Sequence, residues 1–120
     1  MKTIYLSILL TLFLSTPLFS QFIALQKGDR VEVRDIRGVY ITSSYYSGLK
    51  EIAQGDNIII LRYNTDKVEV RSTELKYITS SHYSNLMKIS ATDDYMVLHY
   101  DNGKIEVRDS DLKYISSWYH

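Results

Sequence analysis

The 120-residue sequence contains no cysteine, and its only proline is Pro17. The lack of cysteine excludes a disulfide, which small exported domains often use for stability, and it excludes a lipid anchor on cysteine. After residue 17 there is no proline to interrupt the hydrogen-bond ladder of a sheet. Stability must therefore come from packing or from assembly.

The sequence also lacks a block of charge of one sign. It has 14 basic and 14 acidic residues, and no basic stripe stands out. Nucleic-acid binding depends on neutralising phosphates with clustered lysine and arginine. We therefore expect no nucleic-acid partner.

Catalytic motifs are missing as well. The chain has neither a Gly-x-Ser-x-Gly nucleophile motif nor a His-Glu-x-x-His zinc motif, and no glycine-rich phosphate loop occurs. Turn aspartates such as Asp93 and Asp94 supply oxygen atoms that calcium could use, but aspartate is also an ordinary turn former. We expect no enzyme activity, no cofactor and no metal site.

Residues 1–20 have the pattern of a secretory signal peptide. Lys2 gives a basic start, an apolar run follows over residues 4–14, and Ser20 precedes the expected cleavage point. The apolar run is shorter than the roughly 20 residues that span a membrane, although an uncleaved N-terminal anchor is the alternative. We expect a secreted or periplasmic protein with no membrane span after signal cleavage.

One sequence pattern occurs three times at a spacing of 37 residues. The copies are VEVRDIRGVYITSS from Val31, VEVRSTELKYITSS from Val68 and IEVRDSDLKYISSW from Ile105. Such a repeat points to stacked, similar structural units. It divides the repeat domain, residues 21–120, into a partial unit and two full units: 21–47, 48–84 and 85–120.

Each full unit is predicted to be a four-stranded antiparallel meander. The copies of IEVRD alternate apolar and charged residues, as a pleated strand requires, and residues 58–63 and 95–100 are rich in β-branched and aromatic residues. Asn102-Gly103 predicts a tight hairpin with positive φ at both positions. Phe22–Gln26 aligns with residues 59–63 and 96–100, so the partial unit begins on its second strand. The predicted fold is all-β, with 3 + 4 + 4 strands.

Residues 86–117, LMKISATDDYMVLHYDNGKIEVRDSDLKYISS, resemble one blade of a β-propeller of the NHL or YVTN type. The resemblance lies in the order of apolar strand, Asp-Asp turn, apolar strand, Asp-Asn-Gly-Lys hairpin and charged-apolar strand. It extends over nearly all of residues 21–120, as about two and three-quarter repeats. The resemblance implies propeller-blade-like meanders.

The number of units does not suffice for a closed propeller, which has about 4–8 blades. Two chains could join as half-propellers with six blades, the three units could wrap as a β-trefoil, or the chain could be a fragment of a longer propeller. Exposed sheet edges have to be covered, so we expect self-association. The blade-like hairpin order favours half-propellers over the trefoil.

A Glu-x-Arg pair recurs in every unit. Residues i and i+2 of a strand share a face, so each glutamate lies beside its arginine. The arginines could reach a ligand carboxylate or a sugar hydroxyl, or the pairs could form an ion-pair ladder that fixes strand register and keeps one face wet. The arginines with possible polar contacts to a ligand are Arg34, Arg71 and Arg108.

Aromatic residues follow the last predicted strand of each unit. In a propeller these loops would share one face, and exposed aromatic rings can stack on sugars or pack against a protein. The predicted ligand-binding residues are Tyr45, Tyr46, His82, Tyr83, Trp118 and Tyr119. In the alternative interpretation, Tyr46, Tyr83 and Tyr119 wedge between blades. The tyrosines within the strand, Tyr40, Tyr77 and Tyr114, are predicted to be core.

The sequence thus predicts a secreted, non-enzymatic, propeller-like binding or scaffold module that is completed by homo-oligomerisation. A protein or a glycan is its expected ligand. The alternative function is a small carbohydrate-binding lectin of trefoil or oligomeric propeller type.

Overall fold

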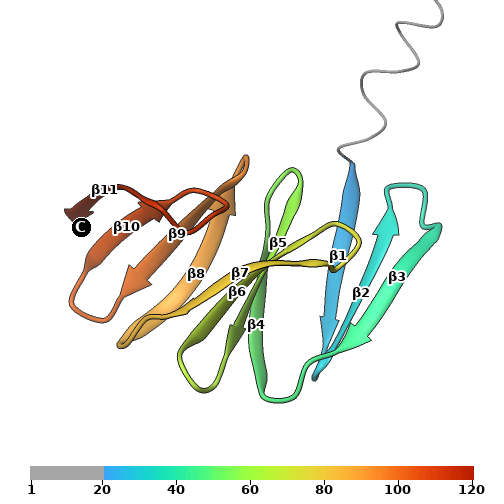
Figure 1. Cartoon of the computed structure of the whole chain (residues 1–120), viewed down its shortest axis with the longest axis horizontal. Coiled ribbons are helices and arrows are strands. Elements are labelled where there is room, and N and C mark those ends of the chain that lie inside the picture. The colour runs from blue at the N-terminus through green and yellow to red at the C-terminus, as the bar shows by residue number, and fades with distance from the viewer. Residues whose placement is uncertain (1–20) are drawn as a thin grey trace, which may run out of the picture.

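The computed structural model describes residues 21–120, all of whose regular elements are β-strands (Figure 1). The predicted signal peptide, residues 1–20, lies outside the described residues. Within the described part of the chain, no helix is long and apolar enough to cross a membrane.

The strands form three antiparallel sheets, each a meander in which consecutive strands are neighbours. The first sheet contains β1 (Phe22–Lys27), β2 (Arg30–Asp35) and β3 (Tyr40–Tyr45). The second contains β4 (Leu49–Gln54), β5 (Ile58–Tyr63), β6 (Lys67–Ser72) and β7 (Tyr77–His82). The third contains β8 (Leu86–Thr92), β9 (Tyr95–Tyr100), β10 (Lys104–Arg108) and β11 (Tyr114–Tyr119).

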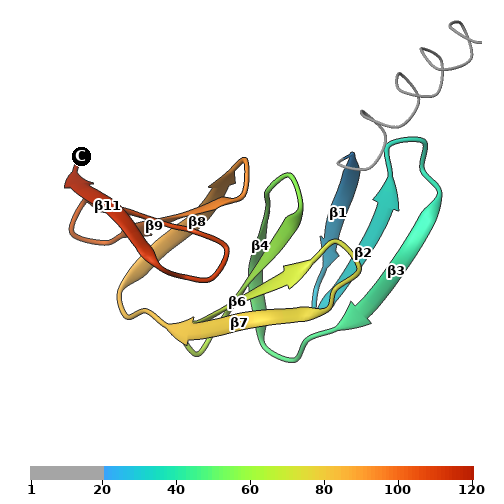
Figure 2. The same ribbon diagram turned by 45° about the horizontal axis from the view of Figure 1, so that its top comes forward.

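The sheets lie side by side in chain order, as both views show (Figures 1 and 2). The predicted 3 + 4 + 4 strand count is therefore confirmed. The β-trefoil alternative is wrong, because strands pair only within their own unit instead of sharing one barrel.

Neighbouring sheets pack face to face at two joints. We call the face of a sheet toward the preceding sheet its leading face and the face toward the following sheet its trailing face. The first joint contains Val31 and Val33 from the first sheet and Ile59, Leu61 and Leu75 from the second. The second joint contains Ile60, Val68 and Val70 from the second sheet and Met96, Leu98 and Leu112 from the third.

Strand β5 shows why the sequence folds in this way. Its residues 58–61 are a continuous apolar run, Ile-Ile-Ile-Leu, and all four side chains are buried. A strand with an apolar layer on each face needs such a run, whereas a strand with one covered face needs only alternation. The second sheet is accordingly the one that is covered on both faces.

The first hairpin is one residue shorter than its counterparts, which shifts the alignment of β1. Two residues, Gly28 and Asp29, connect β1 to β2, whereas three residues connect β5 to β6 and β9 to β10. The equivalent cross-strand pairs are Ala24–Val33, Ile60–Val70 and Val97–Val107. Phe22 therefore corresponds to Ile58, and its predicted alignment with Ile59 is wrong by one residue.

The Asn102-Gly103 turn also differs from the prediction. Gly103 has φ 88°, but Asn102 is not among the residues with positive φ. The loop has three residues, and in such loops only the last position takes the left-handed conformation. Asp66 has φ 68° at the same place in the preceding hairpin.

Gln54 of β4 covers part of the outer edge of β1. The Ala24 N–H donates a hydrogen bond to Gln54 Oε1 (2.9 Å), and Gln54 Nε2 donates one to the Phe22 carbonyl oxygen (2.6 Å). Within residues 21–120, the first sheet has no counterpart of β4 or β8 at this edge. The side-chain amide therefore satisfies backbone groups that a further strand would otherwise bind.

Leu61→Ala and Leu25→Ala form a matched pair of substitutions at equivalent places in β5 and β1. Leu61 is 0% exposed and Leu25 is 51% exposed. We expect Leu61→Ala to lower the free energy of unfolding by about 2–5 kcal/mol, because it leaves a cavity in a joint. Leu25→Ala should change it by less than about 1 kcal/mol. Urea unfolding at dilute protein concentration measures the free energy of unfolding of both variants. Equal losses of stability in the two variants would contradict the exposure of the leading face of the first sheet.

Candidate functional site

Each full unit holds a buried glutamate between two cations. Glu69 is 3% exposed and lies 3.1 Å from Lys67 Nζ and 2.5 Å from Arg71 Nε. The Tyr63 hydroxyl donates a hydrogen bond to the same carboxylate at 3.3 Å. Burial of a carboxylate is costly unless charge and hydrogen bonds compensate it, and here they do.

The third unit repeats this arrangement around Glu106, which is also 3% exposed. Its carboxylate lies 3.5 Å from Lys104 Nζ and 2.5 Å from Arg108 Nη2, and the Tyr100 hydroxyl donates to it at 3.3 Å. The ion pairs therefore run along one strand, not across strands as a ladder would. The predicted wet face is wrong for Glu69 and Glu106, because both carboxylates are buried.

The repeated arginines hold the loop that follows their own strand. Arg71 Nη1 donates to the Leu75 carbonyl oxygen (2.8 Å), and Arg108 Nη1 donates to that of Leu112 (2.7 Å). The two leucines have φ 64° and 63°, and their side chains are buried in the joints. Arg34 Nη1 contacts the carbonyl oxygen of Gly38 in the same way (2.7 Å). The arginines are thus engaged with groups of their own chain.

Two of these arginines lie between aromatic rings. The Arg71 guanidinium carbon is 4.9 Å from the ring centre of Tyr46 and 5.7 Å from that of Tyr77. Arg108 lies at 5.1 Å from Tyr83 and 5.9 Å from Tyr114. Because Tyr46 and Tyr83 belong to the preceding unit, each stack connects two sheets by cation–π attraction.

Arg34 has half of this arrangement. It lies 5.9 Å from the ring centre of Tyr40, which corresponds to Tyr77 and Tyr114. Among the described residues no second ring lies over it. Its leading side, where Tyr46 and Tyr83 sit in the other units, is open.

The structure separates the predicted aromatic binding residues into three positions, one of which is held by Trp118 alone. Tyr45, His82 and Tyr119 are equivalent, because they pair with Arg30, Lys67 and Lys104 in register, and all three are exposed. The next position is held by Tyr46, Tyr83 and His120, whose N–H groups bond to the carbonyl oxygens of Asp29, Asp66 and Gly103. The predicted wedge position is correct for Tyr46 and Tyr83 and wrong for Tyr119.

The tyrosines at the start of the outermost strands are exposed, so their predicted place in the core is wrong. Tyr40, Tyr77 and Tyr114 are 51%, 55% and 56% exposed. Their hydroxyl groups contact the hydroxyl groups of Ser43, Ser80 and Ser117 at 2.8–2.9 Å. The outermost strand of each sheet has no cover on this side within residues 21–120, so a large ring there need not be core.

Trp118 lies on the trailing face of the third sheet. It pairs directly with Ile105, and Ser44 and Ser81 hold the same register position in the other sheets. The face is hollowed by a cavity of ≈ 540 Å³. Its lining includes Val97, His99, Ile105, Trp118 and His120.

Polar side chains occupy equivalent positions in β1, β5 and β9, namely Gln26, Arg62 and His99. Gln26 Nε2 lies 3.4 Å from the Lys50 carbonyl oxygen, and Arg62 donates to the carbonyl oxygens of Met87 (3.0 Å) and Leu86 (2.6 Å). Both reach the first strand of the following sheet. His99 is the third member and contacts Ser90 Oγ (2.9 Å) on the open trailing face, where burial lowers its pKa.

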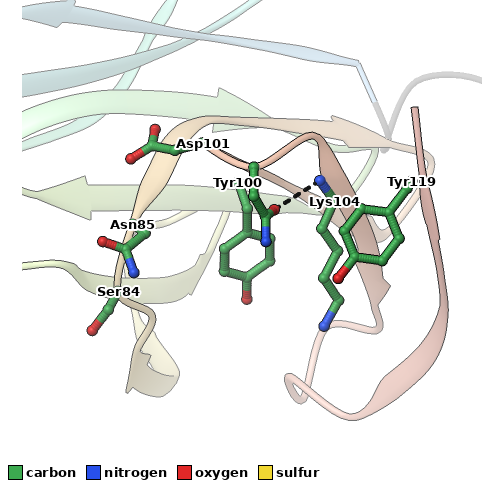
Figure 3. A pocket seen from close by; sticks show the side chains of 7 residues that line it. Ser84, Asn85, Tyr100, Asp101, Lys104 and Tyr119 are labelled. Atoms are coloured by element: carbon green, nitrogen blue, oxygen red, sulfur yellow. Dashed lines mark hydrogen bonds between the residues drawn. The ribbon is translucent and has the colours of Figure 1, made fainter.

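A second cavity, of ≈ 440 Å³, lies between the β7–β8 connection and the β9–β10 hairpin. Figure 3 shows the Lys104 side chain extending beside the rings of Tyr100 and Tyr119. Ser84, Asn85 and Asp101 add polar groups to its wall. Tyr119 is 70% exposed, so its ring is accessible beside this polar wall.

The turn aspartates mostly bind groups of the chain itself. The Asp94 carboxylate accepts hydrogen bonds from the Asn57 N–H (2.7 Å) and from Asn57 Nδ2 (3.1 Å). This contact joins the second and third sheets. Asp109 Oδ1 accepts the N–H groups of Asp111 and Lys113 and so shapes the β10–β11 loop.

The buried glutamates perturb two tyrosines. Burial and the nearby Glu69 carboxylate raise the pKa of Tyr63 to about 12. Burial and the nearby Glu106 carboxylate likewise raise the pKa of Tyr100 to about 12. Both phenols remain protonated and donate to their glutamates well above the ordinary pKa of tyrosine.

We expect Tyr63 and Tyr100 to ionise late in an alkaline titration followed by tyrosinate absorbance. Tyr63→Phe and Tyr100→Phe should each remove one late step. Because the folded pKa is raised, the stabilisation is complete below about pH 10 and is lost as pH rises toward about 12. An unchanged number of late steps after either substitution would contradict this assignment.

Solved structures with this arrangement of sheets are propellers. Kluyveromyces marxianus Hsv2 matches with a TM-score of 0.64 and 13% identity, over 82% of this chain and 36% of that one. The Neurospora crassa Pan2 WD40 domain matches with a TM-score of 0.58 and 14% identity, over 83% and 35%. HIRA residues 644–1017 match with a TM-score of 0.62 and 9% identity, over 75% and 31%.

The fold is that of β-propeller blades. Each sheet of this chain is one blade, so the described residues contain two four-stranded blades and one three-stranded blade. The chain spans about a third of the length of these propellers. No known protein family and no curated protein matches the sequence, and identities this low show the fold alone.

Proposed function

We propose that this chain is an exported, non-enzymatic propeller module of the NHL or YVTN type that binds or scaffolds other molecules after two copies join into a six-bladed ring. One observation carries the proposal. The leading face of the first blade and the trailing face of the third blade are open, although the same positions are buried at both joints. Export is supported by the signal-peptide pattern of residues 1–20, and the lack of a catalytic motif supports a non-enzymatic role.

The open leading face belongs to β1. Ile23 and Leu25 are 41% and 51% exposed, whereas their counterparts Ile59 and Leu61 are fully buried in the first joint. Burying apolar surface contributes about 25 cal/mol per Å². The exposed side chains are therefore suited to contact another apolar sheet face.

The open trailing face belongs to β9 and β10. Val97, Ile105 and Val107 are half-buried, and their counterparts Ile60, Val68 and Val70 are fully buried in the second joint. The two open faces thus carry the two halves of one further joint. A second copy supplies both halves at once, and head-to-tail contact that closes on itself generates a ring.

The joint between copies would be smaller than the internal joints. Leu49 of β4 and Leu86 of β8 contribute to the internal clusters, whereas the first blade has no counterpart of these strands within residues 21–120. Less apolar area is therefore available to stabilise the contact. We expect an assembly that dissociates reversibly on dilution.

The test uses one charged substitution on each open face. Leu25→Asp blocks the leading face and Ile105→Asp blocks the trailing face, because a charge buried in a joint without a partner is unfavourable. In sedimentation velocity we expect the wild type to form dimers and each variant to be monomeric. A mixture of the two variants should form 1:1 dimers through the one remaining pair of intact faces.

Ile115→Asp is the matched control, because Ile115 is 47% exposed on the outermost strand β11, away from the joints. It should associate as the wild type does. A wild type that stays monomeric at every concentration overturns the half-propeller dimer. Association that survives both face substitutions would place the contact elsewhere and overturn it too.

A second candidate function is carbohydrate binding at the cavity shown in Figure 3. An exposed tyrosine ring beside lysine, asparagine and aspartate side chains offers stacking together with hydrogen bonding. Tyr119 would supply the ring, and Asp101 and Lys104 would bind sugar hydroxyl groups.

A glycan array with the wild type and Tyr119→Ala tests this candidate. We expect the loss of stacking to weaken binding of any positive glycan about 3- to 10-fold. Tyr45→Ala removes an equally exposed ring that is distant from this cavity and should leave binding unchanged. No glycan bound, or equal effects of both substitutions, would remove this candidate.

A further inference from the structure

The loop between β2 and β3 has a small residue where the other blades have a large one. Leu75 and Leu112 insert into the joints, but the equivalent residue of the first blade is Gly38. On the trailing faces the sizes are reversed: the first two blades have a small residue at one register position, and the third blade has a large one there. Ser44 pairs with Val31 and Ser81 pairs with Val68 on the trailing faces of the first two sheets, whereas Trp118 pairs with Ile105 on the open trailing face of the third.

The same loop lacks one ring of the aromatic–arginine stack. Tyr46 covers Arg71 and Tyr83 covers Arg108 from the preceding blade. His120 holds the equivalent place after β11, since its N–H bonds to Gly103 as those of Tyr46 and Tyr83 bond to their hairpins. An imidazole is planar and can stack on a guanidinium, so His120 is suited to the open side of Arg34.

We propose that the β2–β3 loop of one copy binds the end of β11 of the other copy, with Trp118 over Gly38 and His120 on Arg34. The inference rests on the proposed head-to-tail dimer and specifies which residues form it. In each internal joint the loop supplies a leucine, and the trailing face of the preceding blade carries a serine at this register position. In the joint between copies the loop would supply a glycine and the trailing face a tryptophan. The large side chain of Trp118 would thus compensate for the small residue in the loop, as complementary packing requires.

The size exchange gives a test by double substitution. Trp118→Ser removes the large side chain, and we expect it to weaken dimerisation roughly 10-fold or more, as truncation of an interface tryptophan does. Gly38→Leu adds a second large side chain and should weaken dimerisation by a similar factor through overpacking. The double variant restores the leucine–serine combination of the internal joints and should return to within about 3-fold of the wild type.

The added leucine has space in the loop but strains its backbone, because Gly38 has φ 88° and residues with a Cβ rarely adopt positive φ. Leu75 and Leu112 already adopt φ 64° and 63°, and a Cβ at Gly38 would meet no atom within 4 Å in the single chain. Urea unfolding of each variant below the dimerisation concentration separates effects on the fold from effects on association. Sedimentation equilibrium gives the dimerisation constants.

His120→Tyr supplies a second, independent measurement. It recreates the tyrosine of the internal stacks, and we expect dimerisation to strengthen on the order of 3- to 10-fold. His82→Tyr makes the same chemical change at an exposed place on β7 and should have no effect. Combining His120→Tyr with Arg34→Lys should remove most of the gain in dimerisation strength, because lysine lacks the planar guanidinium on which the ring would stack.

The outcomes distinguish this inference from the proposed dimer. If the wild type dimerises and Leu25→Asp disrupts it, but the Gly38→Leu/Trp118→Ser variant is no better than the weaker single variant, the inference is overturned and the dimer stands. An unchanged constant for His120→Tyr overturns the stacking contact in the same way. A wild type that never dimerises overturns both.

Discussion

Burial of apolar side chains between neighbouring blades is the interaction on which the rest of the structure depends. The second blade is covered on both faces, so β5 needs an unbroken apolar run, whereas β1 and β9 are covered on one face each. A meander of three or four strands has little core of its own, and stacking supplies it. The two ends of the stack therefore carry the same apolar positions as its interior, and within residues 21–120 these positions are left exposed or half-buried.

The glutamate–arginine unit ties the polar loops to this apolar stacking. Arg71 contacts its own Glu69, the Leu75 carbonyl group of its own loop and the Tyr46 ring of the preceding blade. One side chain thus fixes the loop, positions the leucine that enters the joint and binds the neighbouring blade. The same set recurs around Arg108, which explains why the pattern in the sequence is repeated without an inserted residue.

The sequence predicted the strands and their order well, because alternation and the spacing of 37 residues report directly on pleating and stacking. It did not predict the register of β1, since a two-residue loop replaces a three-residue one and no motif fixes the alignment there. The exposure of Tyr40, Tyr77 and Tyr114 escaped prediction because a ring on an outermost strand is apolar in sequence but uncovered in space. For the arginines the sequence left a ligand contact and an ion-pair role open, and it missed their backbone carbonyl acceptors, which a sequence does not display.

The place of Gln54 has a consequence for solubility. An unpaired strand edge is a template on which further strands of any chain can add, and repeated addition leads to fibrils. Gln54 binds the Ala24 N–H and the Phe22 carbonyl group on the outer edge of β1. An incoming strand would first have to displace that amide and would find two backbone groups already occupied. One glutamine thereby protects an edge to which further strands could otherwise add.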